Sequence, residues 1–337
     1  MNAYERFFNL LDNRPVDRLP AIPICMTFAA RQMGVKYGPY LRDHRILVDT
    51  QIAFAERFDL DMVGLISDPA REAEDCGAEV VWFDDQPTAH DPANPLLKSK
   101  SDLRKLVPPD PQAGRMFDRV QGAELFRERV GGQIPILGWV EGPMAEAADL
   151  RGINEIMFDL ADDADFCRDL FDFVIEMELR FARAQIDAGV DIMGIGDAAA
   201  SLIGPRFYHD LVFDYEKRLV DGIQAMGCPV RLHICGRIDH LLEDIARLDI
   251  DVIDIDCLTD LQLARQVLGP DVAILGNFDP VQYLLWGTPE EVLEQSARCH
   301  QVVGPKYLVG PGCEVPPASP PENVHAIVQY ARTTGGN

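Results

Sequence analysis

Basic residues are scarce in this chain of 337 residues, which has 31 lysines and arginines against 55 aspartates and glutamates and a formal net charge of −24. Such a chain repels phosphate backbones and anionic lipid headgroups. It has no apolar run near the roughly 20 residues that a membrane span needs. Its charged N-terminus also lacks the apolar segment of a secretory signal. We therefore expect a cytoplasmic protein that binds neither nucleic acid nor membranes.

Cysteine is too sparse for a disulfide scaffold, because the whole chain has eight. In a reducing compartment these thiols are core residues or metal ligands. Glycine-rich phosphate loops are missing as well, since neither GxGxxG nor GxxxxGK[ST] occurs. A doubly wound open sheet would want such a loop after an early strand, and it is the alternative architecture.

Short β-branched apolar runs recur along the chain, and each is followed by a stretch with helical spacing. The eight runs that we interpret as strands are residues 21–26, 60–67, 135–142, 190–197, 229–236, 250–257, 272–278 and 306–313. Strands that alternate with helices form a parallel sheet with right-handed crossovers, and eight such units close into a barrel. The sequence therefore predicts an α/β fold, a (β/α)8 TIM barrel.

The helical stretches are clearest at 163–189, 207–227 and 322–333. The long stretch between the second and third strands adds an accessory hairpin around 79–85 and a helix over 116–130. We predict that this N-terminal insertion and the barrel form a single domain over residues 1–337.

Polar or reactive side chains stand at the carboxyl ends of the predicted strands, where the active sites of such barrels lie. They are Ser67, Asp68, Glu141, Asp197, His233, Cys235, Asp254, Asp256, Asn277, Cys313 and Glu314. Polar residues also occur wherever a buried strand gives way to an exposed loop. For any single acid this structural explanation is about as good as a catalytic role. Carboxylates that face a barrel mouth are costly unless they are used, so the whole set favours an active site.

The sharpest pattern is His233-Ile-Cys235, because positions i and i+2 of a strand share one face. Chance gives such a pair in roughly one of six sequences of this composition. Cys313 closes the last strand at the same rim, and one imidazole with two thiolates is a ligand set for zinc. Three protein ligands leave the fourth position open, as in catalytic sites. The alternative is three unrelated core residues.

Asp256 is the best candidate for a fourth ligand or for a carboxylate that supports the ligands, and Asp254 lies on the same face. A helix cap near Thr259 or a solvated loop acid explains either aspartate comparably well. The remaining histidines fall away from the strand ends, and we expect them to be surface or structural residues. They are His44, His90, His209, His240, His300 and His325.

Several motifs resemble the uroporphyrinogen decarboxylase superfamily in order and spacing, over nearly the whole chain. They are RPVDRLP, LISDPAREAEDCGAEV, VEGPMAEAADLRG, GDAAASLIGPRFY, LHICG, LGNFDP and GPGCEVPPASPPENV. The resemblance implies the (β/α)8 fold and one of two chemistries. One is porphyrinogen decarboxylation without a cofactor, and the other is zinc-dependent methyl transfer that involves corrinoid proteins.

The decarboxylase chemistry transfers badly to these residues. Asp68 matches the catalytic aspartate of the decarboxylases, but their RQAGR motif becomes residues 30–35, ARQMGV, and loses its second arginine. Their C-terminal Gly-His-Gly becomes residues 310–312, Gly-Pro-Gly, and their substrate-binding serine becomes Ala198. An octa-anionic substrate needs cationic partners, so these losses matter physically.

The methyltransferase chemistry transfers well. The His-x-Cys pair and distant Cys of enzymes that methylate coenzyme M fall on His233, Cys235 and Cys313. The acidic residue that can occupy the open zinc position in those enzymes falls on Asp256. The resemblance implies that zinc takes a substrate thiol as thiolate, which attacks a methyl group on a corrinoid protein. In the reverse direction zinc would polarise the leaving heteroatom of a methylated small molecule.

Glu141 or Asp197 could orient the substrate or manage a proton. The chain has no D-x-H-x-x-G motif, so we expect a partner protein to supply the corrinoid. A non-catalytic barrel that serves as a binding or assembly partner is a third possibility.

Overall fold

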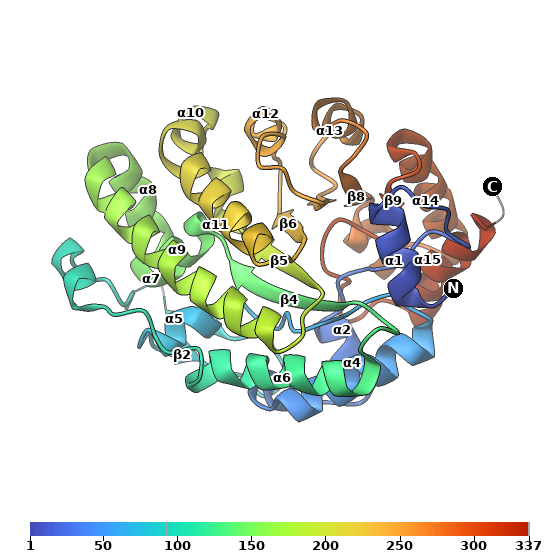
Figure 1. Ribbon diagram of the computed structural model, residues 1–337, viewed down its shortest axis with the longest axis horizontal. Helices are drawn as coiled ribbons and strands as arrows, with labels where there is room; N and C mark the ends of the chain where they lie inside the picture. The colour runs from blue at the N-terminus through green and yellow to red at the C-terminus, as the bar shows by residue number, and fades with distance from the viewer. Residues whose placement is uncertain (92, 336–337) are drawn as a thin grey trace.

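A curled sheet of seven parallel strands forms the centre of the protein, with helices around it (Figure 1). The computed structural model describes residues 1–91 and 93–335. The strand order is β1-β4-β5-β6-β7-β8-β9. The strands are β1 (Val63–Gly64), β4 (Ile136–Glu141), β5 (Ile192–Gly196), β6 (Val230–Ile234), β7 (Val252–Ile255), β8 (Ala273–Gly276) and β9 (Tyr307–Leu308). Each lies within one of the predicted runs, and the barrel-like α/β fold is confirmed.

The first predicted run closes the ring without forming a strand. Ala21 pairs with Val309 in a single parallel bridge, and its carbonyl accepts a hydrogen bond from Asp61 N at 2.9 Å, beside β1. The prediction of a strand over 21–26 is therefore wrong. Pro20 and Pro23 have no N–H and cannot donate to a ladder on either side.

A buried carboxylate holds this junction in place of a longer ladder. Asp61 Oδ2 accepts hydrogen bonds from Ala21 N and from Arg18 Nη1, both at 2.7 Å. Arg6 Nη1 donates to the other oxygen at 2.5 Å. Burial raises the pKa of Asp61, although the two arginines oppose that effect. We name residues 20–22, Asp61 and Val309 the closing junction.

Helices cover the outside of the sheet (Figure 1). They are α1 (Ala3–Leu11), α2 (Thr27–Gln32), α3 (Tyr37–Arg42), α4 (His44–Phe58), α5 (Arg71–Asp75), α6 (Gly114–Val130), α7 (Pro143–Arg151), α8 (Ile153–Asp162), α9 (Ala164–Asp187), α10 (Pro205–Phe207), α11 (Phe213–Ala225), α12 (Leu242–Ile245), α13 (Leu261–Leu268), α14 (Pro289–Val303) and α15 (Pro321–Thr333). Short 3-10 segments are η1 (Lys100–Lys105) and η2 (Ala198–Leu202), and π-helical segments are η3 (Tyr208–Val212) and η4 (Pro280–Leu285).

Local chemistry sets the ends of these helices, as α14 illustrates. Thr288 and Glu291 form a capping box, Pro289 occupies the first turn, and Gly304 ends the helix at φ 79°. Of the three clearest predicted helices, 163–189 and 322–333 correspond to α9 and α15. The third, 207–227, is divided among α10, η3 and α11.

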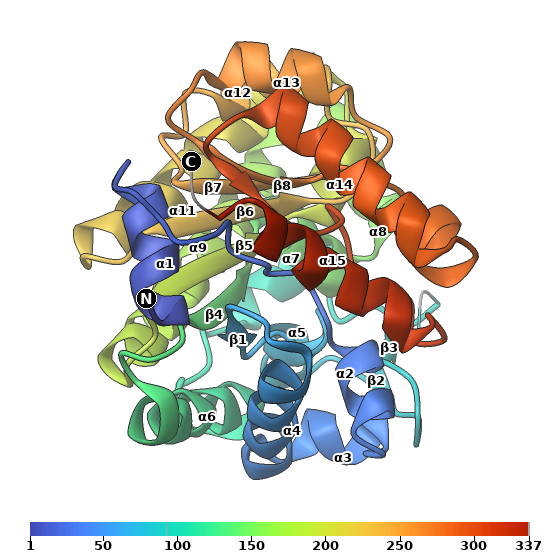
Figure 2. The same ribbon diagram turned by 90° about the vertical axis from the view of Figure 1, so that its right-hand side faces the viewer.

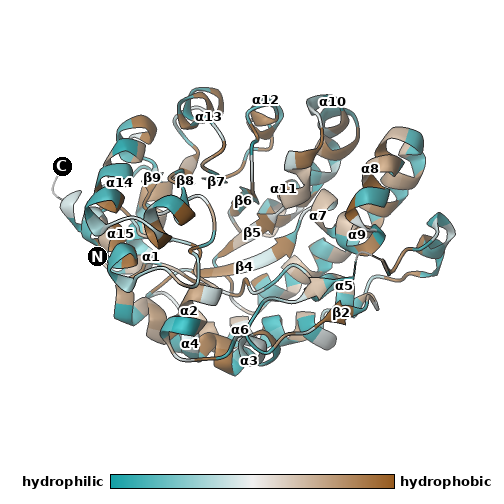
Figure 3. Ribbon diagram, turned by 180° about the vertical axis from the view of Figure 1, so that it is seen from behind, coloured by the Kyte–Doolittle hydropathy of each residue, from teal (hydrophilic) through white to brown (hydrophobic). Residues whose placement is uncertain are grey.

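The core lies between the sheet and the helices, because every residue of β4 to β8 is buried. The central strands are mostly hydrophobic in Figure 3, whereas the surrounding helices carry both colours. Parallel strands that are covered on both faces have this near-continuous apolar character. In the described part of the chain, no helix is long and apolar enough to span a membrane.

The predicted insertion between the second and third predicted strands, here β1 and β4, is present. β2 (Val80–Val81) and β3 (Ala89–His90) pair in an antiparallel hairpin, and Figure 2 shows them side by side. The helix predicted over 116–130 is α6. This hairpin brings His90 to the carboxyl-terminal side of the sheet, beside α7.

Candidate active site

Three side chains that were predicted as metal ligands meet at the carboxyl ends of β6 and β9. His233 lies in β6, Cys235 follows on the same face, and Cys313 comes after β9. His233 Nε2 is 2.9 Å from Cys235 Sγ, and the two sulfur atoms are 3.5 Å apart. One ligand atom from each residue lies within 4.8 Å of the others. We name these three residues the sulfur–imidazole cluster.

The spacing of the two sulfur atoms is close to that around a tetrahedral ion. Two thiolates bound to one zinc ion stand about 3.7 Å apart, given zinc–sulfur bonds of about 2.3 Å. Gly312 allows the chain to bring Cys313 this close, because a Cβ there would clash with the carbonyl of Ile255 at the end of β7. The donor set and the approach of the chain therefore fit zinc, whose binding stays a prediction.

A buried aspartate orients the imidazole. Asp254 Oδ2 lies 2.9 Å from His233 Nδ1, and Arg231 Nε and Nη2 both donate to the same carboxylate. Burial disfavours the charge on Asp254, but Arg231 outweighs it and lowers the pKa. Burial likewise opposes protonation of His233, yet the bond to Asp254 raises its pKa to about 9. Such carboxylates typically fix the ring orientation of metal-binding histidines.

The sequence analysis missed Arg231, although a signal was present. It stands two residues before His233 in β6 and therefore faces the same side of the strand. A buried arginine on that face needs a carboxylate partner.

The two thiols differ in acidity. The hydrogen bond with Cys235 lowers the pKa of Cys313 to about 5, despite the opposing effect of burial. The same hydrogen bond and burial raise the pKa of Cys235. The lowered pKa favours the thiolate form of Cys313, and thiolates are the form of cysteine that binds metals.

Trp139 and Glu141 extend from β4 beside the cluster. The indole lies 6.0 Å from the His233 ring, centroid to centroid, and its Nε1 donates to Glu141 Oε1 at 3.0 Å. Gly194 and Gly196 of the neighbouring strand β5 leave room for them, because a Cβ at either position would overlap the indole or the Glu141 carboxylate. Glu141 is almost fully buried, and burial raises its pKa well above the usual range, with repulsion from Glu72 adding to the effect.

Two other predicted acids make structural contacts. Asp256 Oδ1 accepts a hydrogen bond from Leu258 N at 2.9 Å in the turn after β7, as a capping residue does. Among the described residues, Asp256 is not part of the close ligand group. Asp197 is fully buried and accepts from Ala145 N and Met144 N in the first turn of α7. Burial, and repulsion from Glu216, raise the pKa of Asp197 well above normal. Catalytic roles for both remain predictions.

Asp68 is bonded on both oxygens. Arg115 donates to them at 3.0 and 2.6 Å, and the Thr88 and Ser67 hydroxyls donate at 2.7 and 3.0 Å. Burial favours the protonated form, but Arg115 outweighs it and lowers the pKa to about 2. Asp68 therefore serves as the anchor of a buried ion pair, and its predicted catalytic role is untested.

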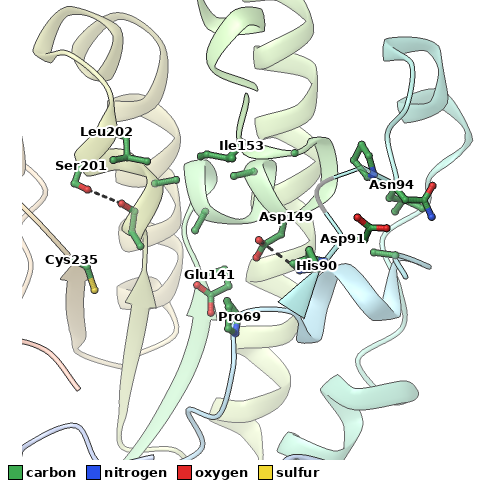
Figure 4. Close-up of a pocket in the computed structure, with 18 of the residues that line it drawn as sticks. Pro69, His90, Asp91, Asn94, Glu141, Asp149, Ile153, Ser201, Leu202 and Cys235 are labelled. Carbon is green, nitrogen blue, oxygen red and sulfur yellow. Dashed lines mark hydrogen bonds and ion pairs between the residues drawn. The ribbon is translucent and has the colours of Figure 1, made fainter. Parts of the chain in front are cut away.

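A cavity of about 490 Å³ opens beside the cluster. Figure 4 shows Cys235 at one side of it, the His90–Asp149 pair at the other and Glu141 between them. Small and aliphatic side chains form much of the remaining wall, and they are Ala145, Ala148, Ile153, Ala198, Ala199 and Leu202. Glu141 is the one predicted acid that lines this cavity.

The sequence analysis also missed His90 and Asp149. His90 Nε2 lies 3.6 Å from Asp149 Oδ1 across the cavity wall. Burial lowers the pKa of His90 and raises that of Asp149. His90 ends the short hairpin strand β3 and Asp149 belongs to α7, so neither stands at the end of a strand that the sequence predicted.

A group of buried acids surrounds Arg71 behind the cavity. Arg71 Nη2 donates to Glu72 Oε1 at 2.7 Å and lies 3.9 Å from Glu141 Oε1. Glu146 and Glu178 are fully buried, and their carboxylates have no hydrogen-bond partner among the described residues. Burial raises the pKa of both well above normal, and repulsion from Glu178 adds to the effect on Glu146 as repulsion from Glu72 does on Glu178.

We expect the substitution Glu146→Met to stabilise the protein by about 1–3 kcal/mol at pH 8, because it removes an unsatisfied buried carboxyl. A raised folded-state pKa contributes stability at low pH that is lost as pH rises through that pKa. The advantage of the variant should therefore shrink at pH 5. Urea unfolding at both pH values measures it, with Glu128→Met on exposed α6 as the control. If the stability gained by Glu146→Met did not grow with pH, the raised pKa of Glu146 would be contradicted.

The family model described as "Uroporphyrinogen decarboxylase (URO-D)" matches residues 2–334. A methylcobamide:CoM methyltransferase, MtbA of Methanosarcina acetivorans, is 28% identical, with 97% of each chain covered. The uroporphyrinogen decarboxylase of Hydrogenovibrio crunogenus is 25% identical, with 96% of this chain and 95% of that protein covered.

A solved methyltransferase from Methanosarcina mazei has the same fold. The two structures superpose with a TM-score of 0.89 at 22% identity, and the match covers 99% of this chain and 98% of the other. The likeness supports the barrel-like α/β fold.

Proposed function

The chain belongs to the uroporphyrinogen decarboxylase family, and from that premise we propose that it is a zinc-dependent methyltransferase. It moves a methyl group between a corrinoid protein and a small thiol or methylated small molecule. The observation that carries the proposal is the convergence of His233, Cys235 and Cys313 beside a cavity of small-molecule size. The likeness to a methylcobamide:CoM methyltransferase over the full chain supports it.

His233, Cys235 and Cys313 would hold the zinc ion. The ion supplies a Lewis acid that lowers the pKa of a substrate thiol, so that the thiol reacts as thiolate near neutral pH. Asp254 keeps the imidazole in one orientation, and Arg231 keeps Asp254 charged. The two cysteine sulfurs bring negative charge, which leaves electron density on the substrate sulfur.

The substrate sulfur would attack the methyl carbon carried by the corrinoid. Its electron pair forms the new S–C bond, while the Co–C bond breaks and leaves its pair on cobalt as Co(I). The thiol proton passes to solvent. Glu141 lines the cavity and would orient the substrate, and the apolar walls exclude water from the reacting sulfur.

The decarboxylase alternative has less support. Asp68, which matches the catalytic aspartate of decarboxylases, is already paired with Arg115. Among the described residues that line the cavity there is no lysine or arginine. A substrate with eight carboxylates would therefore meet an acidic wall.

Methylcobalamin can stand in for the corrinoid protein in a direct assay. We expect the zinc-loaded protein to convert methylcobalamin and a small thiol into the S-methyl thioether and cob(I)alamin, which are followed by mass spectrometry and by anaerobic absorbance. The same preparation should form no coproporphyrinogen from uroporphyrinogen. Turnover of uroporphyrinogen without thiol methylation would assign the chain to the decarboxylases instead.

A further inference from the structure

The cavity beside the cluster carries acidic groups at both of its ends. Glu141 and Asp149 form its inner part, and Glu79 and Asp91 stand at the exposed outer part. The basic side chain among the described lining residues is His90, and burial keeps its pKa below the usual range. At neutral pH the described lining therefore offers carboxyl groups and no fixed positive charge.

Glu141 has one oxygen free to meet a ligand. Its residue is 5% exposed, Oε1 accepts the Trp139 hydrogen bond, and Oε2 has no hydrogen-bond partner among the described residues. The nearest cation is Arg71, but it lies behind the cavity wall and its closer partner is Glu72, at 2.7 Å compared with 3.9 Å. Glu141 is thus a buried carboxyl group that lines the cavity and has one oxygen without a partner among the described residues.

The charges behind the wall do not favour an anion either. Arg71 is the single arginine among Glu72, Glu141, Glu146 and Glu178, all of which are buried. A negatively charged ligand would find no free counter-charge here, because Arg71 is already paired with Glu72, and an anion desolvated without a counter-charge is costly. A cation would instead relieve the burial cost of the Glu141 charge.

We propose that the small substrate is an aminothiol, or its S-methyl thioether, whose protonated amine binds between Glu141 and Asp149 while its sulfur reaches the sulfur–imidazole cluster beside Cys235. This inference rests on the proposed methyl transfer and names its substrate class. The ammonium keeps its proton throughout, because the transferred methyl group forms its bond to sulfur alone. The chain would thereby differ from relatives that use coenzyme M, a thiol with an anionic sulfonate.

Three two-carbon thiols of similar size test the effect of the charge on the end group. Cysteamine ends in an ammonium, 2-mercaptoethanol in a hydroxyl and 2-mercaptoethanesulfonate in a sulfonate. With methylcobalamin as donor, we expect kcat/KM for cysteamine to exceed that for the sulfonate on the order of 10- to 100-fold. Equal or better use of the sulfonate would overturn the inference.

A binding measurement keeps the inference testable without turnover. The S-methyl thioethers of the same three thiols are titrated into the zinc-loaded protein by calorimetry, and the amine should bind most tightly. If no thiol is methylated but the amine thioether still binds best, the proposed transfer fails and the charge preference stands. If methylation occurs without preference for the amine, the transfer stands and the substrate class fails.

The substitution Glu141→Gln tests the residue itself. Glutamine keeps an oxygen for the Trp139 hydrogen bond and removes the negative charge, so binding of the amine thioether should weaken about tenfold, the equivalent of one ion pair. The preference for the amine thioether over the neutral hydroxyl thioether should shrink by the same factor, and retained zinc binding shows that the variant is folded. Glu128→Gln, the same change on the exposed face of α6, is the control. An unchanged amine preference in Glu141→Gln would overturn the role of Glu141.

Discussion

Replacing Cys235 with serine is expected to abolish both metal binding and methyl transfer. A serine hydroxyl is a much poorer zinc ligand than a cysteine thiolate. The two ligands that remain, His233 and Cys313, would hold zinc only weakly. Zinc content should fall from about one ion per chain to near zero after dialysis. Methyl transfer should fall on the order of 10³-fold, which corresponds to the several kcal/mol that a metal ion contributes.

The control for this variant is Cys257→Ser. Cys257 follows β7, is only partly buried and lies outside the close ligand group of the described residues. It should retain zinc and activity. X-ray absorption of the unaltered protein should show two sulfur neighbours and one imidazole nitrogen from His233, Cys235 and Cys313. Full zinc and full activity in Cys235→Ser would disprove the proposed centre.

Replacing Asp254 with asparagine should lower the free energy of unfolding by about 3–5 kcal/mol, because it leaves Arg231 buried without its counter-charge. The same change removes the carboxylate that orients His233. Zinc affinity should therefore fall by about 10- to 100-fold. Urea unfolding and zinc titration against a chelator measure the two effects separately.

The paired variant Arg231→Met with Asp254→Leu separates stability from metal binding. Apolar side chains in place of a buried ion pair are often neutral or stabilising, so the fold should regain most of the lost free energy. His233 still lacks its acceptor, so zinc affinity should remain low. A paired variant that binds zinc as tightly as the unaltered protein would show that Asp254 does not position the imidazole.

The order of the strands followed from the sequence, because alternation of apolar runs with helical stretches leaves few topologies. The short extent of the strands next to the ring closure did not follow. The run 60–67 forms a strand only at Val63–Gly64, and the run 306–313 only at Tyr307–Leu308. In 21–26 the apolar residues were visible, but Pro20 and Pro23 decided the backbone pairing.

The site was predictable where it depended on one strand. The alternation in β6 placed His233 and Cys235 on a common face, and the strand-end rule brought Cys313 to the same rim. Asp197 and Asp68 stood at strand ends too, but their partners come from distant segments. The N-terminus of α7 occupies Asp197, and Arg115 of α6 occupies Asp68.

The acidic cavity could not be predicted from the sequence for a related reason. His90 and Asp149 belong to a hairpin and a helix that lie far apart in the chain, and only the folded insertion brings them together. The space around Trp139 and Glu141 depends on glycines in a neighbouring strand, which a pattern of apolar residues does not reveal.

The closing junction has a consequence for how the proposed zinc ion would be retained. The ring is joined there by a clasp of one backbone bridge and the Asp61 carboxylate, and the chain continues from Val309 directly to Cys313. An opening of this clasp would carry the Cys313 sulfur away from His233 and Cys235, which lie on the opposite, fully paired side of the ring. Loss of a bound ion would then need only a local opening that leaves the rest of the barrel intact.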